Sequence, residues 1–381
     1  MNTQRFLKIT CLLLLLGLPK VVQAQVAYST NADGSVTILD YGGPPWAVTI
    51  PTNINGLPVT SIGDAAFFEN GSLTSFTIGN SVTSLGDDIF TYCENLTNVT
   101  IGNSVTNIGD FDFEYCSNLT SVTIGNSVTS VGGEAFQYCR GLTSITIPNS
   151  VTNIGNSAFY FCTALTNVTI GTNVTSIEDY AFDGTSLIRL TIPNSVTSIG
   201  YMTFEDISVA QLIIPNSVTS IGEYAFAASG LINVTIGNGV TNIGDYAFGG
   251  CTRLTRVYFQ GNSPTPTNDT SVFSREPATV YYLPGTIGWG TTFDGIPAVL
   301  WNPQAQRNAS FGVKTNQFGF NITGSSNLVV VVESCTNLAN PVWTPVSTNT
   351  LNTFVGTNGT SYFSDPQWTN YPARFYGFSF P

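Results

Sequence analysis

Carboxylates recur at one position of a repeated sequence, and this column is the first feature of the chain that suggests chemistry. Each acid lies three residues before a phenylalanine, and the column comprises Asp64, Asp87, Asp110, Asp179, Glu223 and Asp245. Carboxylates in a row can act in acid–base catalysis or bind a cation. The structural alternative is that each acid accepts backbone N–H bonds at the start of a short helical turn. We favour this helix-cap interpretation, because Gly133 and Asn156 occupy the same position in other repeats.

The densest group of acids gives no stronger indication of a metal site. Asp110, Asp112 and Glu114 follow one repeat after Asp87 and Asp88. They lack the glycine-and-ligand spacing of a dedicated calcium loop. The chain also contains no histidine, so general base chemistry would fall on carboxylates, and no pair of them stands out. We therefore expect no catalytic residue, no metal site and no cofactor, and we expect that the protein is not an enzyme.

Cysteine forms a second column, three residues after the phenylalanine. Its members are Cys93, Cys116, Cys139, Cys162 and Cys251. Without histidine or paired Cys-x-x-Cys ligands, a zinc site is not indicated. Stacked cysteines one strand apart are close enough to form disulfides, although parallel Cβ directions make this awkward. We expect free, buried thiols that fill a turn.

The carboxylates and cysteines belong to a unit that recurs every 22 or 23 residues. The phenylalanines that mark it are Phe67, Phe90, Phe113, Phe136, Phe159, Phe182, Phe204, Phe226 and Phe248. A fixed period of roughly 20–29 residues rich in Leu, Val and Ile predicts a solenoid, because one coil cannot bury its apolar face alone.

Residues 119–139 show how one coil is expected to fold. Val122 and Ile124 alternate with polar residues, which is the period of a half-buried strand. A second extended segment follows. After Gly132 we expect a short helical turn that buries Phe136.

The strand residues that point away from the core form the surface that a partner can reach. Small hydroxyl and amide side chains occupy most of it, and larger side chains occur towards its end. The candidate partner-binding face comprises Ser121, Thr123, Ser144, Thr146, Asn167, Thr169, Arg189, Gln211, Asn233, Arg256 and Tyr258. The alternative is a solvated β surface without a ligand.

The first 24 residues have the pattern of a secretory signal peptide. Arg5 and Lys8 precede an apolar run at residues 9–18, and small residues stand at the expected cleavage site. A retained membrane anchor is the alternative. Cleavage leaves eight basic and 23 acidic residues, a net charge of −15. This charge argues against nucleic acid as a partner, and no later apolar run reaches the ~20 residues of a membrane span.

The remaining segments depart from the repeat. Residues 25–58 are predicted to cap the start of the solenoid, which occupies 59–260. Residues 261–302 are predicted to cap its far end. Residues 303–381 contain several short strands and are predicted to form a small all-β module of sandwich type.

The unit LTSVTIGNSVTSVGGEAFQYC at residues 119–139 resembles the BspA-type leucine-rich repeat family. The pattern of that family is roughly L-x-x-[IV]-x-[IL]-P-x-[ST]-V-T-x-I-G-x-x-A-F-x-x-C. Residues 147–155 and 214–222 match it almost letter for letter, and the resemblance covers about 59–260. Membership implies a leucine-rich-repeat solenoid with secreted or cell-surface roles, often in adhesion, and transfers no catalytic residues. The strands near Cys335, Trp343 and Arg374 resemble a C-terminal module common in secreted bacterial proteins.

The predicted fold is therefore mainly β: a leucine-rich-repeat solenoid of nine 22–23-residue repeats with N- and C-terminal caps, followed by a small β-sandwich-like module. The predicted function is that of a secreted or cell-surface bacterial protein, a monomer, that binds another protein or mediates adhesion. One alternative is carbohydrate binding, supported by the amide-rich face and by Tyr258, Trp289 and Trp368. The other alternative is a structural spacer.

Overall fold

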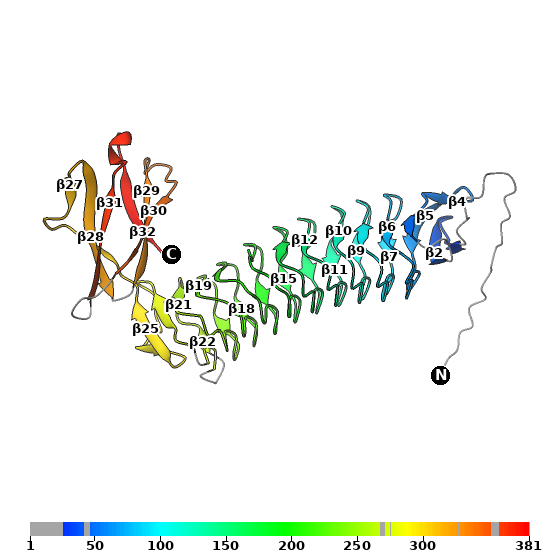
Figure 1. Ribbon diagram of the computed structural model, residues 1–381, viewed down its shortest axis with the longest axis horizontal. Coiled ribbons are helices and arrows are strands. Elements are labelled where there is room, and N and C mark those ends of the chain that lie inside the picture. Colours follow the sequence, from blue (N-terminus) through cyan, green and yellow to red (C-terminus); the bar gives the residue numbers. More distant parts are fainter. Residues whose placement is uncertain are drawn as a thin grey trace.

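The computed structural model describes residues 26–41, 46–266, 271–274, 276–325, 328–351 and 358–380. The repeats stack into one elongated solenoid, and the C-terminal strands form a second unit at its far end (Figure 1). This confirms the predicted solenoid followed by a small β module. In the described ranges the only helix is the 3-10 helix η1 (Trp368–Asn370), and no helix there is long and apolar enough to cross a membrane. The predicted signal peptide lies outside the described residues.

One extended segment of each coil contributes to a row of parallel strands that we call the front sheet. Its strands are β3 (Ala47–Thr49), β6 (Ser75–Thr77), β8 (Asn98–Thr100), β10 (Ser121–Thr123), β12 (Ser144–Thr146), β14 (Asn167–Thr169), β17 (Gln211–Ile214), β19 (Asn233–Ile236), β21 (Arg256–Phe259), β23 (Thr279–Tyr282) and β25 (Ile296–Leu300). Equivalent residues of successive coils are paired, as in Ser144↔Asn167, so each repeat position forms a straight column. Arg189 joins the row through an isolated bridge to Asn167.

A second row of parallel strands forms the back sheet. It comprises β2 (Val36–Tyr41), β5 (Leu57–Ile62), β7 (Ser84–Leu85), β9 (Asn107–Ile108), β11 (Ser130–Val131), β13 (Asn153–Ile154), β15 (Ser176–Ile177), β16 (Ser198–Ile199), β18 (Ser220–Ile221), β20 (Asn242–Ile243) and β22 (Thr265–Pro266). Most of these strands have two residues, one pointing inward and one outward, as in the aliphatic Ile154 and the polar Asn153.

The third side of each coil, from the carboxylate column to the cysteine column, is here called the turn edge. The predicted helical turn does not form. The residue after the carboxylate has a positive φ, as in Asp88 (59°) and Phe111 (59°), and this left-handed backbone conformation prevents a continuous helix. The backbone N–H groups of Asp88, Phe90 and Tyr92 instead donate to carbonyls of the next coil.

The core runs the length of the solenoid. The repeat phenylalanines are fully buried or nearly so, and their rings stack from Phe67 to Phe273 with centroids 5.0–5.4 Å apart. Phe273 lies beyond the last sequence repeat, and β23 and β25 continue the parallel pairing of β21. The coiling therefore extends past residue 260, into the segment that the sequence indicated only as a cap.

Antiparallel strands cover both ends of the solenoid. They are β1 (Val26–Thr30) on β2, β4 (Asn53–Ile54) on β5 and β24 (Thr292–Phe293) on β25.

The C-terminal module is built from two antiparallel sheets. One contains β26 (Gln304–Gln306), β27 (Gly312–Lys314), β28 (Gln317–Ser325) and β31 (Asn358–Asp365), and the other contains β29 (Val329–Cys335), β30 (Thr344–Thr350) and β32 (Phe375–Ser379). Their inner faces share a core with the last coils, in which Tyr258 and Trp301 pack with Phe320 and Val330. The module is thus joined to the solenoid by buried apolar surface.

Candidate functional site

The carboxylate column serves to hold neighbouring coils together. The Oδ1 atom of Asp87 accepts the backbone N–H of Asp110 at 3.0 Å, and Oδ1 of Asp110 accepts that of Gly133 at 2.7 Å. Asp64 and Asp179 bind the following coil in the same way. The cap interpretation is therefore wrong in its geometry, because the N–H donors belong to the next coil rather than to the acid's own turn. The acids still bind backbone N–H groups, and this accounts for their repetition.

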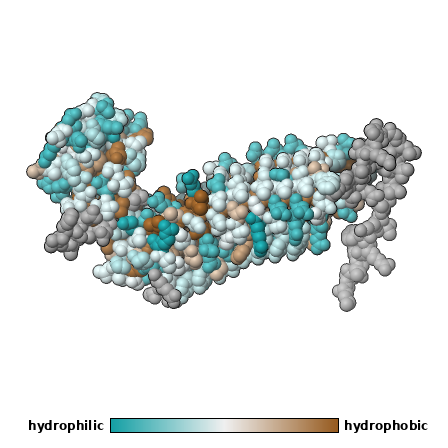
Figure 2. All heavy atoms as spheres, viewed as in Figure 1, coloured by the Kyte–Doolittle hydropathy of each residue, from teal (hydrophilic) through white to brown (hydrophobic). Residues whose placement is uncertain are grey.

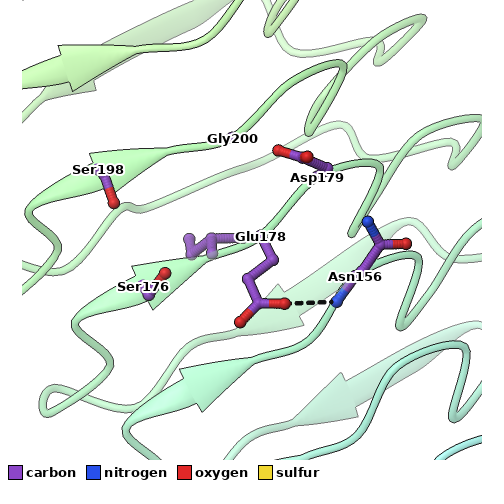
Figure 3. Close-up of a pocket in the computed structure, with 7 residues that line it drawn as sticks. Asn156, Ser176, Glu178, Asp179, Ser198 and Gly200 are labelled. Atoms are coloured by element: carbon purple, nitrogen blue, oxygen red, sulfur yellow. Dashed lines mark hydrogen bonds between the residues drawn. The ribbon is translucent and has the colours of Figure 1, made fainter.

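A shallow hollow of about 270 Å³ lies where this ladder is interrupted, and Figure 3 shows the residues that line it. Gly133 stands in the carboxylate column and offers no acceptor to the N–H of Asn156 in the next coil. Glu178, in the following coil, supplies this acceptor instead. Its Oε2 accepts the Asn156 N–H at 3.0 Å, and its Oε1 accepts a side-chain N–H of Asn153 at 2.8 Å. Both oxygens are thus engaged, so we assign this hollow a structural role.

Several other acids of the turn edge have raised pKa values, and Asp112 and Asp183 are the most buried of them. Asp112 is fully buried, and burial raises the pKa of its carboxyl, while N–H bonds from Gly109 and Ile89 oppose the shift. Burial and the nearby carboxylates of Glu205 and Asp206 raise the pKa of Asp183 to about 7. Across the described ranges, no group of three or more His, Cys, Asp or Glu side chains is arranged to hold a metal ion.

The cysteine column also joins neighbouring coils. Each described cysteine of the solenoid is free and buried, as predicted, and its thiol donates to a carbonyl of the preceding coil. The distances from Sγ to the phenylalanine oxygen are 3.0–3.2 Å for Cys93, Cys116, Cys139, Cys162 and Cys251. Burial raises the pKa of Cys93 to about 12 and that of Cys251 to about 11. These thiols are therefore unsuited to nucleophilic or redox chemistry at neutral pH.

Threonine hydroxyls make similar bonds beside the back sheet. Thr129 Oγ1 donates to the carbonyl of Thr106 at 2.9 Å, and Thr152 Oγ1 donates to that of Thr129 at 3.2 Å. The same bond recurs at Thr106, Thr175, Thr197, Thr219 and Thr241. This column is exposed and regular, yet each of these hydroxyl protons is used within the solenoid.

The predicted partner-binding face lies on the outer side of the front sheet. The side chains of Ser121, Thr123, Ser144, Thr146, Asn167, Thr169, Arg189 and Gln211 are exposed, and those of Asn233 and Arg256 are half-buried. Within the described chain, Thr100, Thr123 and Thr146 make no side-chain hydrogen bond. This face therefore differs from the other columns in keeping unused hydrogen-bonding groups.

Tyr258 is the exception among the predicted face residues. It was expected to be exposed, but its side chain is fully buried. Its ring packs at 5.0 Å from Phe380 of the module and at 5.3 Å from Tyr281. The module thus covers the outer side of the front sheet at its last coils, and Tyr258 is not available to a partner.

The module rises from the last coils on the side of β19 and β21, so that it and the front sheet enclose an inner corner (Figure 1). Figure 2 shows hydrophobic side chains gathered on the solenoid near this corner. Ile188 and Ile213 are 58% and 68% exposed, and they belong to the same coils as Arg189 and Gln211. We call the five residues Ile188, Arg189, Gln211, Ile213 and Arg256 the elbow patch.

The two isoleucines of the elbow patch were missed in the sequence. Ile213 occupies the position that is threonine in the other coils from Thr77 to Thr235, and it pairs with Thr235 of the next strand. Aligning the repeats column by column would have revealed it as an apolar residue on a polar face. The burial of Tyr258 had no such local signal.

The aromatic residues predicted to support a carbohydrate ligand are poorly placed for one. Trp289 is half-buried and stacks on Tyr282 with centroids 5.1 Å apart. Trp368 is half-buried in the module and donates its indole N–H to Asn316. The most exposed tryptophan is Trp46, at 70%, next to β3. The sequence offered no signal for its exposure.

Comparison with known proteins supports the repeat assignment. The family described as BspA type leucine rich repeat region (6 copies) matches residues 60–188 and 175–284. A leucine rich cell surface protein from Faecalibacterium prausnitzii is 27% identical, with 69% of this chain and 95% of that chain covered and a TM-score of 0.46. A leucine-rich repeat protein from Bacteroides ovatus is 22% identical, with 75% and 100% covered and a TM-score of 0.47. No curated protein matches the sequence.

Proposed function

The chain belongs to the BspA-type leucine-rich repeat family, and from this premise we propose that it is an exported bacterial binding protein whose front face docks a protein partner. The face would serve adhesion at the cell surface or in the surrounding medium. The predicted signal peptide supports export. Leucine-rich repeat proteins commonly mediate protein interactions through an extended open surface.

The elbow patch is the observation that carries this proposal. Elsewhere the front face offers small hydroxyls and amides, which bind water as readily as a partner. Ile188 and Ile213 add exposed apolar surface of the kind that anchors interfaces. Arg189 and Arg256 add positive charge to a chain with more than twice as many acids as bases. The patch therefore suits a protein segment that combines an apolar side chain with carboxylates.

The proposal is tested by measuring binding to purified extracellular matrix proteins, immobilised one at a time, by surface plasmon resonance. The double variant Arg189→Glu with Ile213→Ser should weaken binding by at least about tenfold, since patch anchors carry much of the energy of an interface. Arg253→Glu is the matched control, because Arg253 is also exposed but lies in the loop between Cys251 and β21, outside the elbow patch. Its affinity should be unchanged.

Two results would overturn the proposal. One is binding that survives the double variant unchanged, which would place the interface elsewhere. The other is the absence of binding to every protein of the panel, which would favour a structural spacer. Thermal unfolding of the double variant should match that of the wild type, because both side chains lie on the surface.

The cellular location of the protein is tested in a separate experiment. Cell fractionation of the producing bacterium would show whether the intact chain remains with the envelope or enters the medium. Deleting residues 303–381 would move it from the envelope to the medium if the module attaches it. Retention of the truncated chain would assign attachment to another segment.

A further inference from the structure

A groove at the first coils of the solenoid is separate from the elbow patch and has different chemistry. It has a volume of about 660 Å³, and its lining residues are Trp46, Gly71, Ser72, Thr74, Asn95, Thr97, Asn118 and Thr120. None of them is charged. Trp46, Thr74, Thr97 and Thr120 stand at one repeat position, immediately before strands β3, β6, β8 and β10. The floor of the groove is therefore a straight column with one tryptophan at its end.

Trp46 is the dominant side chain of the groove. Its indole is 70% exposed, although tryptophan is highly buried on average in folded proteins. Its backbone is fixed by the fold, because its carbonyl accepts the N–H groups of Thr74 and Ser75. The ring thus offers a large aromatic surface from a backbone position held by the sheet.

The hydroxyl and amide oxygens of the groove can accept hydrogen bonds from a ligand. The side-chain amide of Asn95 donates one N–H to the Gly71 carbonyl at 2.7 Å, and that of Asn118 donates one to the Glu94 carbonyl at 2.8 Å. The hydroxyls of Thr97 and Thr120 donate to the carbonyls of Thr74 and Thr97. The amide Oδ1 atoms of both asparagines remain available as acceptors, since an amide oxygen has two lone pairs.

This inventory limits the class of ligand. Phosphates, sulfates and carboxylates are bound most strongly by positively charged donors, and no lysine or arginine lines the groove. A cation would require carboxylates, and none lines the groove. A neutral polyol fits, because its hydroxyls donate to the acceptors while the apolar face of its ring lies on the indole.

We propose that the Trp46 groove binds an extended, neutral glycan of the β-1,4-linked type. Adjacent strands of a sheet lie about 4.8 Å apart, and a flat, extended hexose chain has a repeat of similar length. One sugar ring stacks on Trp46, and successive rings follow the column of Thr74, Thr97 and Thr120. A helical α-linked glucan does not follow a straight column of acceptors.

The proposal is tested by isothermal titration of the full-length mature protein with cellohexaose, xylohexaose and maltohexaose. Cellohexaose or xylohexaose should bind, and maltohexaose should bind at least about tenfold more weakly. Trp46→Ala should weaken binding by at least about tenfold, and Trp46→Tyr should restore most of it by keeping an aromatic face. Trp343→Ala is the matched control, since Trp343 is also exposed, at 38%, but lies immediately before β30 in the module.

A circular dichroism melt confirms that the Trp46 variants are folded. Failure of all three oligosaccharides to bind would overturn the proposal, and so would equal affinities for the wild type and Trp46→Ala. The Arg189→Glu, Ile213→Ser variant should keep its glycan affinity. Loss of glycan binding in that variant would place the glycan at the elbow patch and also contradict the proposal.

Discussion

The front sheet and the turn edge both carry polar side chains in periodic columns, yet they use these side chains in opposite ways. On the turn edge the carboxylates and thiols bind the backbone of neighbouring coils, as Asp110 binds Gly133 and Cys139 binds Phe113. On the front face, Thr123 and Thr146 make no such bond within the described residues. A repeated polar column in a solenoid therefore indicates stacking as readily as recognition, and unused hydrogen-bonding groups distinguish the two.

The largest expected effect concerns the core beneath the turn edge. Phe136→Ala removes a fully buried ring that stacks between Phe113 and Phe159. The free energy of unfolding should fall by about 3–5 kcal/mol. Thr123→Ala on the front face should change it by less than about 0.5 kcal/mol. Urea unfolding followed by circular dichroism measures both, and similar losses in the two variants would remove the distinction between the regions.

Thiol chemistry offers a second contrast between the regions. At pH 8 the native cysteines should react with Ellman's reagent at least about 100-fold more slowly than the added thiol of Thr123→Cys, which corresponds to about 2.7 kcal/mol of opening free energy. Full reactivity should appear in urea. Rapid reaction of the native protein would show that the thiols are accessible and that the turn edge opens readily.

The same thiols should make stability depend on pH in one direction. Burial raises the folded-state pKa of Cys93 to about 12, above the ~8.5 of an unfolded thiol. Its contribution is therefore complete below about pH 8.5 and is lost as the pH rises towards 12. The urea midpoint should fall more between pH 8 and pH 10 in the wild type than in Cys93→Ser. An equal fall would assign the pH dependence to other groups.

Close contact between coils makes glycine necessary beside the carboxylate column. A Cβ atom on Gly109 would lie 2.2 Å from the carbonyl oxygen of Gly86. Gly109→Ala should therefore cost about 1–3 kcal/mol, as overpacking does in protein cores. Gly71→Ala is the control, since its Cβ would meet no atom within 4 Å. Equal unfolding midpoints for the two variants would contradict the proposed contact.

Much of the fold was predictable because the repeat itself encodes it. The 23-residue spacing of the phenylalanines and the alternation around Val122 indicated a solenoid with a continuous core. The helical turn was predicted wrongly, because positive φ values at residues such as Phe111 and Tyr115 leave no period in the sequence. The coils beyond residue 260 were predicted only as a cap, because Phe273 continues the ring stack and Tyr282 continues the strand pairing without the repeat motif.

The candidate site was less predictable, because exposure depends on contacts between distant segments. Tyr258 is buried by Phe380, which lies far along the chain in another module. Trp46 is the largest side chain among the residues that line its groove, and that neighbourhood forms only when the coils stack. The carboxylate column was recognised as a backbone-binding feature, but the partner in the next coil follows only from the stacking of coils.

A smaller effect is expected for the carboxylate ladder. Asp110→Ala removes the acceptor for the Gly133 N–H and should cost about 1 kcal/mol. Asp110→Asn keeps an oxygen at that position and should cost less than half as much. Urea midpoints for the two variants measure the difference. If the alanine variant were no less stable than the asparagine variant, the hydrogen bond would make no net contribution to the free energy of unfolding.

The most direct measurement replaces two sets of exposed threonines with isosteric valine. One triple variant changes Thr106, Thr129 and Thr152 to valine, and the other changes Thr100, Thr123 and Thr146. The first should lower the free energy of unfolding by about 0.5 kcal/mol for each hydroxyl, since each donates to a carbonyl of the preceding coil. The second should leave it unchanged. Equal losses in the two variants would contradict the claim that the front-face threonines, unlike those beside the back sheet, keep their hydroxyls free for a partner.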